Sequence, residues 1–377
     1  MPDLTLVLLG AGNSTRFNQD FKKQWMRIKD DPLWLFVAKR FQSFAKFQKI
    51  IIVANKKEIE YMKNFASYEF VEGGKERQLS LKNALSKVDT KYTLVSDVAR
   101  ACVQKRVVED LIANKDKADV VVPYISVNDT VHYRNDFLNR DDIKLIQTPQ
   151  LSKTKALKKA LNSDEIFTDD STAILKSGGK VHYIKGDKDA AKLTYIDDIR
   201  KLPCLQPPSL ETFVGFGYDV HPFEEQKDMY LGGVKIDVPY GFKAHSDGDV
   251  ALHALIDALL GAAGAGDIGE LFPDNDNRYK NIDSKLLLEE VCNFLKNVGY
   301  QIVNLDITII AQKPKLSNYK QKMRRAISQI TKIPPSRVNI KATTTEKLGF
   351  IGKEEGVASK AIASLKYINW AYSEGTK

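Results

Sequence analysis

The chain has 377 residues, of which 43% are hydrophobic and 28% charged, and its formal net charge is +9. Its length suggests two domains at about 150 residues each, and its composition is that of an ordinary soluble, globular protein. Since no apolar run approaches the roughly 20 residues of a membrane span, and the dispersed basic residues come with no RNA-binding motif, we expect neither a membrane nor a nucleic-acid partner.

The N-terminal stretch MPDLTLVLLGAG predicts a first β-strand. It has no basic segment and no small-residue cleavage site, so it does not have the pattern of a signal peptide. The three cysteines, Cys102, Cys204 and Cys292, are odd in number and far apart. We interpret them as reduced thiols of a cytoplasmic protein.

The first half of the chain alternates strand-like and helix-like segments. Short β-branched runs such as KIIIVAN, YTLVSDV and DVVVPYI are separated by amphipathic stretches such as KERQLSLKNALSKV and QKRVVEDLIANK. This alternation predicts an α/β domain with a mostly parallel, doubly wound sheet. Ligands of such sheets bind outside the carboxyl ends of the strands.

The segment LLGAGNSTRFNQDFKKQW follows the first predicted strand and contains a candidate phosphate site. Gly10 and Gly12 can turn backbone N–H groups toward an anion at the next helix start. Arg16 and Lys23 add two cations, which suits phosphoryl or nucleotidyl transfer because charge develops on phosphate oxygens. The alternative is a plain strand-to-helix turn with solvated surface cations.

A series of segments carries a family resemblance through residues 1–200: LLGAGNSTRF, KKQW, EGGKERQLSL, SDVAR, NDT, TPQ, TDDSTAI and AKLT. On these segments the first domain resembles 2-C-methyl-D-erythritol 4-phosphate cytidylyltransferase, a nucleotidyltransferase with a Rossmann-like fold. The resemblance implies transfer of CMP from CTP to methylerythritol phosphate, release of pyrophosphate, and a Mg²⁺ or Mn²⁺ ion. It also implies a homodimer.

The same resemblance implies roles for the matching residues. Arg16 and Lys23 would stabilise the triphosphate during attack on its α-phosphorus, and Asp97 would bind Mg²⁺ or contact the substrate. The residues implied in CTP binding are Gly10, Ala11, Gly12, Gly73, Gly74 and Ser80. The residues implied in positioning the methylerythritol phosphate are Thr130, Arg140 and Lys192.

The chain also departs from the family pattern. Leu9 and Ser14 replace the usual proline and extra glycine of the phosphate loop, and Ser96 and Ala101 replace a histidine and a proline around Asp97. Lys22 stands where proline is usual, and Trp25 where tyrosine is usual. These changes bear on rate and nucleotide discrimination, and they leave open an alternative in which the first domain is a non-catalytic scaffold.

The segment LPCLQPPSLET carries Pro203, Pro207 and Pro208 and predicts a linker, because clustered prolines resist both helix and central strand. We therefore expect domains at residues 1–208 and 209–377. Beyond the linker, NLDITIIAQK and RVNIKATTTEK are typical of strands, and KLLLEEVCNFLKNVG and SNYKQKMRRAISQITK of helices. This pattern predicts an α+β or α/β second domain.

In the second domain, Asp219 and His221 are two residues apart, so a strand would present both side chains on one face. Asp249, His253 and Asp257 are spaced four apart, on one face of a helix. Asp219, His221 and His253 could supply three ligands and leave an open fourth position, as in a catalytic zinc site. The alternatives are aspartate helix caps, a loop histidine at His245 and a core histidine at His253.

The stretch ATTTEKLGF follows an apolar strand pattern. Its hydroxyl groups could bind phosphate and Glu346 could hold a hard cation such as Mg²⁺. Taken alone, the motif favours the alternative, a strand followed by a capped turn.

A second resemblance covers residues 213–368, on the segments GYDVHPF, AHSDGDVALHALIDALLGAAGAGDIGELFPD, DITIIAQKPKL and IKATTTEKLGFIGKEEG. They are similar to 2-C-methyl-D-erythritol 2,4-cyclodiphosphate synthase, a trimer-forming α+β enzyme. The resemblance implies Zn²⁺ on Asp219, His221 and His253, and a second cation, Mg²⁺ or Mn²⁺, on Glu346. His245 and Ser246 would contact the substrate. The other residues implied at the site are Asp267, Gly269, Asp274, Ala311, Lys315, Thr343, Thr344, Phe350 and Lys353.

Together the resemblances imply a bifunctional enzyme of non-mevalonate isoprenoid synthesis. The second domain would cyclise CDP-methylerythritol 2-phosphate and release CMP. Trimers of this domain and dimers of the first could build a hexamer, and a separate kinase, acting between the two reactions, could make transient contact. A zinc hydrolase on the second domain and a basic nucleic-acid-binding protein are the rival interpretations.

Overall fold

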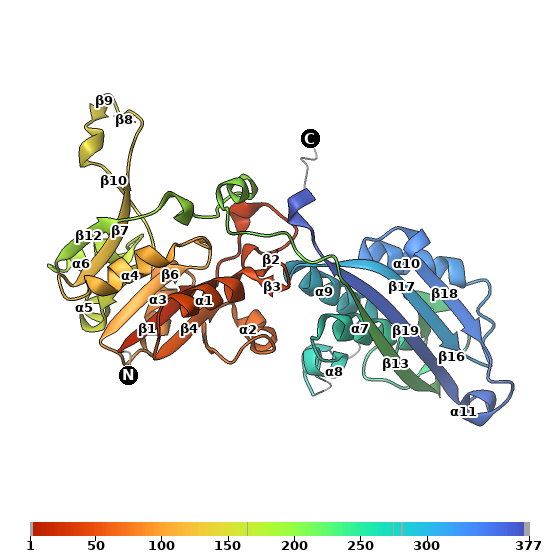
Figure 1. Ribbon diagram of the computed structural model, residues 1–377. Helices are drawn as coiled ribbons and strands as arrows, with labels where there is room; N and C mark the ends of the chain where they lie inside the picture. The colour runs from red at the N-terminus through yellow and green to blue at the C-terminus, as the bar shows by residue number, and fades with distance from the viewer. Residues whose placement is uncertain (1–2, 164, 274, 280–281, 373–377) are drawn as a thin grey trace. The chain divides into compact units, whose positions relative to one another are not determined.

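The computed structural model describes residues 3–163, 165–273, 275–279 and 282–372. The chain forms two compact units, Met1–Pro207 and Pro208–Lys377, and each is described by itself (Figure 1). In the described part of the chain, no helix is long and apolar enough to cross a membrane.

The first unit is built on an eight-stranded sheet in the order β10-β7-β11-β6-β1-β4-β5, with β12 paired to β7. Its strands are β1 (Leu4–Leu9), β4 (Lys49–Ala54), β5 (Glu69–Glu72), β6 (Tyr92–Asp97), β7 (Val120–Ser126), β10 (Lys144–Ile146), β11 (Gln150–Lys153) and β12 (Val181–Lys185). The predicted parallel arrangement holds for β6, β1, β4 and β5. The sheet as a whole is mixed, because β11 inserts antiparallel between β6 and β7.

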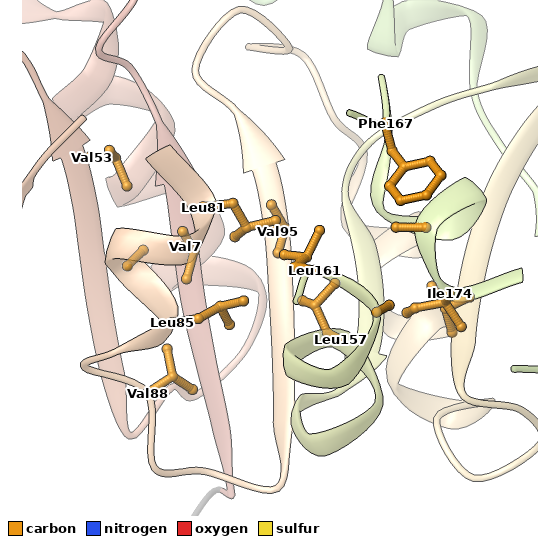
Figure 2. Close-up of a cluster of buried hydrophobic side chains, with 14 of the residues drawn as sticks. Val7, Val53, Leu81, Leu85, Val88, Val95, Leu157, Leu161, Phe167 and Ile174 are labelled. Carbon is orange, nitrogen blue, oxygen red and sulfur yellow. The ribbon is translucent and has the colours of Figure 1, made fainter. Parts of the chain in front are cut away.

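Helices cover this sheet. They are α1 (Leu33–Phe44), α2 (Lys56–Lys63), α3 (Arg77–Leu85), α4 (Lys105–Ala113), α5 (Thr154–Ala160) and α6 (Asp170–Lys176). The short 3₁₀ helices are η1 (Thr15–Phe17), η2 (Lys23–Trp25), η3 (Arg140–Asp142), η4 (Lys188–Ala190) and η5 (Ile196–Lys201). Figure 2 shows the core formed where α3, α5 and α6 meet the sheet, with Leu81, Leu157 and Ile174 among the buried side chains. Burying these apolar groups fixes the strand ends that carry the site residues.

Two short hairpins complete the first unit. One pairs β2 (Arg27–Ile28) with β3 (Asp31–Pro32), and the other pairs β8 (Val131–Tyr133) with β9 (Asp136–Leu138). The second hairpin projects from the sheet beyond β7 and β10 (Figure 1). We call residues 127–143 the arm.

The interpretation of all three cysteines as separate thiols is wrong for two of them. Cys102 and Cys204 form a disulfide, with Cα atoms 5.5 Å apart, and Cys292 is free. The fold brings together positions that are 102 residues apart in the sequence, which spacing alone does not reveal.

The second unit has a five-stranded sheet in the order β16-β13-β19-β17-β18. Its strands are β13 (Thr212–Glu225), β16 (Tyr240–Phe242), β17 (Tyr300–Ile310), β18 (Val338–Thr343) and β19 (Gly356–Tyr367), and a separate pair joins β14 (Met229–Leu231) to β15 (Val234–Ile236). Its helices are α7 (Val250–Ala263), α8 (Ile268–Leu271), α9 (Ser284–Asn297), α10 (Lys320–Thr331) and α11 (Gly349–Gly352), with 3₁₀ turns η6 (Asn277–Tyr279), η7 (Pro335–Arg337) and η8 (Trp370–Tyr372). The predicted α+β class is confirmed.

The most extensive helix–strand contact in this unit lies between α7 and β13. Two glycines of β13 make it possible: a Cβ on Gly215 would lie 2.1 Å from Ala258 O, and a Cβ on Gly217 would lie 1.9 Å from Ala254 O. The helix backbone therefore lies directly on the strand. This close packing places residues of α7 beside Asp219 and His221, which continue the same face of β13.

Candidate functional site

The first unit has a cleft of about 670 Å³ at the carboxyl ends of its parallel strands. Its walls are the segments that follow β1, β4 and β5, together with the end of β6. We call it the first cleft. Its position agrees with the general rule that open α/β sheets bind ligands outside the carboxyl ends of their strands.

Gly10 and Gly73 of the first cleft pack closely against neighbouring segments, whereas a Cβ on Gly12 would meet nothing within 4 Å. Gly10 N–H donates to Val53 O at 2.8 Å, and Gly73 N–H donates to Ala54 O at 2.9 Å. A Cβ on Gly73 would lie 2.2 Å from the Ala11 Cβ, so any larger residue would displace the Gly10–Ser14 loop, the candidate phosphate loop. Gly74 N–H donates to the Ser80 hydroxyl at 3.0 Å.

Lys23 enters this cleft from η2, and its ammonium group donates to Leu193 O at 3.0 Å. Burial, and then the neighbouring charge of Lys192, lower the pKa of Lys23 to about 8. Arg16, in η1, also lines the cleft and is exposed. A poorly hydrated ammonium beside a second cation favours a polyanionic ligand.

Asp97 ends β6 and is held by two cations. Lys192 Nζ lies 2.7 Å from one carboxylate oxygen and Arg77 Nε lies 3.4 Å from the other. Burial would raise the pKa of Asp97, but the charges of Arg77 and Lys192 hold it below its ordinary value. Arg77 in turn contacts the buried Asp170 at 2.6 Å. The carboxylate is therefore ionised and fixed in direction.

The structure brings ten of the sequence-predicted residues together in the first cleft: Gly10, Ala11, Gly12, Arg16, Lys23, Gly73, Gly74, Ser80, Asp97 and Lys192. Thr130 and Arg140 are not among its lining residues. Both are exposed and lie in the arm, where Arg140 Nη1 donates to Asn128 O at 2.8 Å. Within one chain, the arm therefore does not complete the cleft.

Sequence reasoning missed Arg77, Gln24 and the lysine pair Lys56–Lys57, which also line the first cleft. Arg77 lies inside the EGGKERQLSL segment, so its place at a predicted helix start was an available signal. Its partner Asp170 is 93 residues away, and that pairing had no local signal.

The second unit has a cleft of about 500 Å³ beside the start of α7, which we call the second cleft. Three ligand-type atoms converge at its wall. His221 Nε2 lies 3.0 Å from Asp219 Oδ2, His253 Nδ1 lies 3.1 Å from the same oxygen, and the two histidine nitrogens are 3.2 Å apart. Among the described residues, this is the group of three whose geometry could hold a metal ion.

The strand and the helix set this geometry. Asp219 and His221 leave the same face of β13, as their spacing predicted, and His253 lies one turn into α7. Burial would raise the pKa of Asp219, but hydrogen bonds from His221 and His253 hold it below its ordinary value. An ionised carboxylate and two imidazoles are a donor set for a divalent cation.

His253 is held at its other ring nitrogen as well. Nε2 lies 2.9 Å from the Ser284 hydroxyl and 3.2 Å from the Ser246 hydroxyl. Ser284 donates from its hydroxyl to Asp247 at 2.5 Å.

Asp249 caps α7, accepting N–H bonds from Ala251 and Leu252 at 3.2 and 3.1 Å, which confirms the helix-entry role predicted for it.

Other predicted residues surround this metal-type cluster. His245, Ser246 and Gly269 line the second cleft, and Asp267 lies at its edge as the N-cap of α8. Asp274 lies outside the described residues. Sequence reasoning did not assign Lys243, Asp257 or Tyr279 to the site, although all three line it.

The remaining predicted residues lie at or after the ends of β17 and β18 and in or next to α11: Ala311, Lys315, Thr343, Thr344, Glu346, Phe350 and Lys353. None of them is among the lining residues of the second cleft. The Thr344 hydroxyl donates to Glu346 Oε1 at 2.8 Å, and Glu346 adopts a left-handed φ of 51°. Glu346 is exposed and does not join the Asp219–His221–His253 cluster.

Comparisons with known proteins divide the chain in the same way. A family model described as 2-C-methyl-D-erythritol 4-phosphate cytidylyltransferase matches residues 4–202, and the YgbB family model matches residues 212–366. The bifunctional enzyme IspD/IspF of Aliarcobacter butzleri (strain RM4018) is 57% identical over 371 residues, covering 98% of this chain and 99% of that protein.

Two further relatives agree. The bifunctional enzyme IspD/IspF of Sulfurovum sp. (strain NBC37-1) is 54% identical over 370 residues, covering 98% of this chain and 99% of that protein. The solved structure of the bifunctional IspDF from Campylobacter jejuni is 50% identical, with a TM-score of 0.88, and covers 98% of this chain and 99% of that one. The similarity therefore extends over both units and both clefts.

Proposed function

The chain belongs to the family of bifunctional IspD/IspF enzymes, and from this premise we propose how its two clefts carry out the two reactions. It has the cytidylyltransferase and cyclodiphosphate synthase activities of the non-mevalonate isoprenoid pathway. The first unit makes CDP-methylerythritol and pyrophosphate from CTP and 2-C-methyl-D-erythritol 4-phosphate. The second converts CDP-methylerythritol 2-phosphate into the 2,4-cyclodiphosphate and CMP.

In the first cleft, we assign the triphosphate to the phosphate loop. An oxygen of the methylerythritol 4-phosphate attacks the α-phosphorus of CTP, and the bond to the β-phosphate breaks as pyrophosphate leaves. Lys23 and Arg16 stabilise the negative charge that develops on the phosphate oxygens. Lys23 donates to Leu193 O inside the cleft, and burial and then the charge of Lys192 lower its pKa to about 8. Gly73, Gly74 and Ser80 contact the cytosine and ribose.

Asp97 and Lys192 would orient the sugar phosphate in the first cleft, where the structure pairs them at 2.7 Å. A Mg²⁺ or Mn²⁺ ion bound near Asp97 would neutralise triphosphate charge. The substrate-positioning residues Thr130 and Arg140 lie in the arm, so we propose that they complete the cleft of a partner subunit in a dimer. The exposed apolar residues of the arm, Tyr133, Phe137 and Leu138, support such an interface.

In the second cleft, the spacing of the three ligand atoms fits zinc. Ligands at about 2.0–2.2 Å around a tetrahedral zinc ion lie about 3.3 Å apart, and the distances between Asp219, His221 and His253 are 3.0 to 3.2 Å. Zinc bound there would act as a Lewis acid and neutralise repulsion between two phosphates.

The residues of the second cleft then hold the substrate so that its 2-phosphate lies next to its own CDP group. We assign His245 and Ser246 to the substrate phosphates and Gly269 and Asp267 to the erythritol and ribose, as their positions in and beside the second cleft allow. An oxygen of the 2-phosphate attacks the β-phosphorus of the CDP group. The bond to the α-phosphate breaks, and CMP leaves. Enclosure of the substrate supplies the orientation that this intramolecular attack requires.

The group around Thr343, Thr344 and Glu346 lies outside the second cleft, and we propose that it meets the second cleft of a neighbouring subunit in a trimer. The sheet face opposite α7 supports this proposal. It exposes Val214, Phe216 and Tyr218 of β13 and Ile362 of β19, an apolar strip that no helix covers in the described part of the chain. There, Ala311 and Lys315 would bind the cytidine, Phe350 and Lys353 would approach the phosphates, and Glu346 would hold a second cation, Mg²⁺ or Mn²⁺.

Trimers of the second unit and dimers of the first would together build a hexamer, which we place in the cytoplasm. The phosphorylation between the two reactions falls to a separate kinase, which would make at most transient contact. The interpretation of the first unit as a non-catalytic scaffold is wrong. The chain is similar over nearly its whole length to bifunctional enzymes, and it belongs to their family.

A pair of variants tests this division of labour in the full chain. Lys23→Ala should lower pyrophosphate release from CTP and methylerythritol phosphate by about 10²- to 10³-fold and leave cyclodiphosphate formation unchanged. His253→Ala should lose bound zinc and cyclodiphosphate formation while keeping pyrophosphate release. Each variant is the folding control for the other. Full pyrophosphate release by Lys23→Ala, or full zinc content in His253→Ala, would contradict the assignment, and a linear monophosphate product would favour a hydrolase.

A further inference from the structure

Glu58 lies in the first turn of α2 with its carboxylate buried, only 6% of the side chain being exposed. Three donors from the segment that contains η2 converge on it. Lys22 forms an ion pair with Oε1, Trp25 Nε1 donates to Oε2 at 2.8 Å, and Gln24 Nε2 donates to Oε2 at 3.3 Å. Trp25 is fully buried.

One residue of the Lys22–Trp25 turn does not face Glu58. Lys23 sits between Lys22 and Gln24, lines the first cleft and donates to Leu193 O. A buried carboxylate is costly unless it is paired and hydrogen-bonded, and removing one side of such a network leaves unpaired polar groups. The direction in which Lys23 points is therefore coupled to the partners of Glu58.

The same network reaches the phosphate loop through Gln24. Its amide group donates to Gly12 O at 3.3 Å and its carbonyl oxygen accepts from the Ser14 hydroxyl at 3.1 Å. The Ser14 oxygen also accepts from the Lys23 backbone N–H at 3.0 Å. Ser14 itself has a left-handed φ of 58°, a conformation that is less costly for glycine.

Three of the chain's departures from the family pattern therefore meet at one carboxylate. Lys22 and Trp25 bind Glu58 directly, and Ser14 binds it through Gln24. Lys22 lacks the fixed φ of the proline that is usual at its position. Side-chain bonds to Glu58 can supply the rigidity that the sequence change removes.

We propose that Glu58 is a positioning residue for cytidylyl transfer, which orders the Lys22–Trp25 turn and the phosphate loop so that Lys23 meets the triphosphate. This inference rests on the proposed role of Lys23. Glu58 itself is not among the lining residues of the first cleft, so it would act through Lys23. Loss of the carboxylate would release the turn and let water reach the Lys23 ammonium group.

Glu58→Ala and Glu58→Gln in the full chain test this role. Displacing a catalytic group by about 1 Å costs on the order of 10²-fold, so we expect kcat of pyrophosphate release to fall by about 10²-fold in Glu58→Ala and by about tenfold in Glu58→Gln, which keeps one acceptor. The KM for methylerythritol phosphate should be unchanged.

The pH profile separates positioning from general destabilisation. Lys23 must be protonated to meet the triphosphate, so the wild-type kcat/KM for CTP, which reports the free protein, should decline as the pH rises through about 8. A better hydrated Lys23 has a higher pKa, so in both Glu58 variants this alkaline decline should move to higher pH. A smaller folded fraction would instead lower the rate by the same factor at every pH. The cyclodiphosphate synthase rate of the same preparation measures the intact protein.

Glu60→Gln is the matched control, because Glu60 lies on the same helix but is exposed and pairs only with Lys63 among the described contacts. It should leave both the rate and the pH profile unchanged. Wild-type rates in Glu58→Ala, or reduced rates with an unmoved alkaline decline, would overturn the proposal. Lys23→Ala, measured in the same assay, separates the role of Lys23 from the role of Glu58. If Lys23→Ala stays active, the proposed role of Lys23 is wrong. If Lys23→Ala loses activity but the Glu58 variants stay active, the positioning role of Glu58 is wrong.

Discussion

At the scale of single residues, His253 shows how one side chain is fixed from both ends. Its Nδ1 faces Asp219 and His221, and its Nε2 lies 2.9 Å from the Ser284 hydroxyl. Ser284 is buried and is itself fixed by Asp247. Partners of this kind set the orientation of a ligating histidine and raise its affinity for metal.

We therefore expect Ser284→Ala to weaken metal binding by about 10- to 100-fold, because the His253 ring loses a partner that fixes its direction. Competition with a chromophoric chelator measures the affinity. Ser284→Thr keeps the hydroxyl and should recover most of it.

Ser328→Ala provides the comparison for that substitution. Ser328 is also a buried serine of the second unit, but its hydroxyl donates to Ile333 O at 2.6 Å, away from the metal-type cluster. Its loss should cost about 1 kcal/mol of stability and leave metal affinity unchanged. Equal affinities for Ser284→Ala and Ser328→Ala would rule out the positioning role of Ser284.

At the scale of elements, the contact between α7 and β13 decides whether the second cleft forms. Gly217→Ala would put a Cβ 1.9 Å from Ala254 O in the helix backbone, so the helix must move away from the strand. We expect a loss of stability of about 3 kcal/mol or more from this overpacking, together with weaker metal binding, because His253 moves with α7. Thermal unfolding and metal titration measure the two effects.

Gly261→Ala, on the same helix, is the matched substitution. A Cβ there would have no neighbour closer than 4.0 Å, and glycine in a helix interior is unfavourable. This change should be neutral or should stabilise by about 0.5–1 kcal/mol. If Gly217→Ala behaved in the same way, the close contact would not be limiting.

Much of both sites could be predicted from the sequence because it depends on local geometry. A spacing of two residues on a strand puts Asp219 and His221 on the same face. Asp97 is the last residue of its strand and therefore lies at the edge of the sheet. What local spacing could not give was long-range pairing: Arg77 with Asp170, His253 with Ser284, and the three partners of Glu58. The antiparallel insertion of β11 was missed for the same reason, since a strand's own residues do not record its direction.

At the scale of the whole molecule, the disulfide ties the end of the first unit to the segment that follows Asp97. Without reductant, denatured protein should show one reactive thiol, Cys292, and with reductant three. Burial raises the pKa of Cys292 to about 12, so this thiol should react slowly before denaturation. Three reactive thiols without reductant would contradict the pairing.

Breaking the pair should also lower the unfolding free energy of the first unit. The bond spans 102 residues, and closing a loop of that length contributes up to about 4.7 kcal/mol through the unfolded chain. Cys102→Ser with Cys204→Ser should therefore lower its unfolding temperature, while Cys292→Ser should not. Cys102 is fully buried, which limits attack by cellular reductants.

The metal-type cluster affects the amount of folded protein as well as its catalytic activity. Two of its ligands belong to β13 and the third to α7, so a bound ion would cross-link the strand to the helix that covers it. Ligand binding to the folded state alone adds about 2.7 kcal/mol of stability at a free concentration 100 times the Kd. In a cell with little of that ion, more of the protein would be without metal and therefore less stable, and proteases would degrade it faster. The supply of the ion would then affect both the amount of the enzyme and its activity.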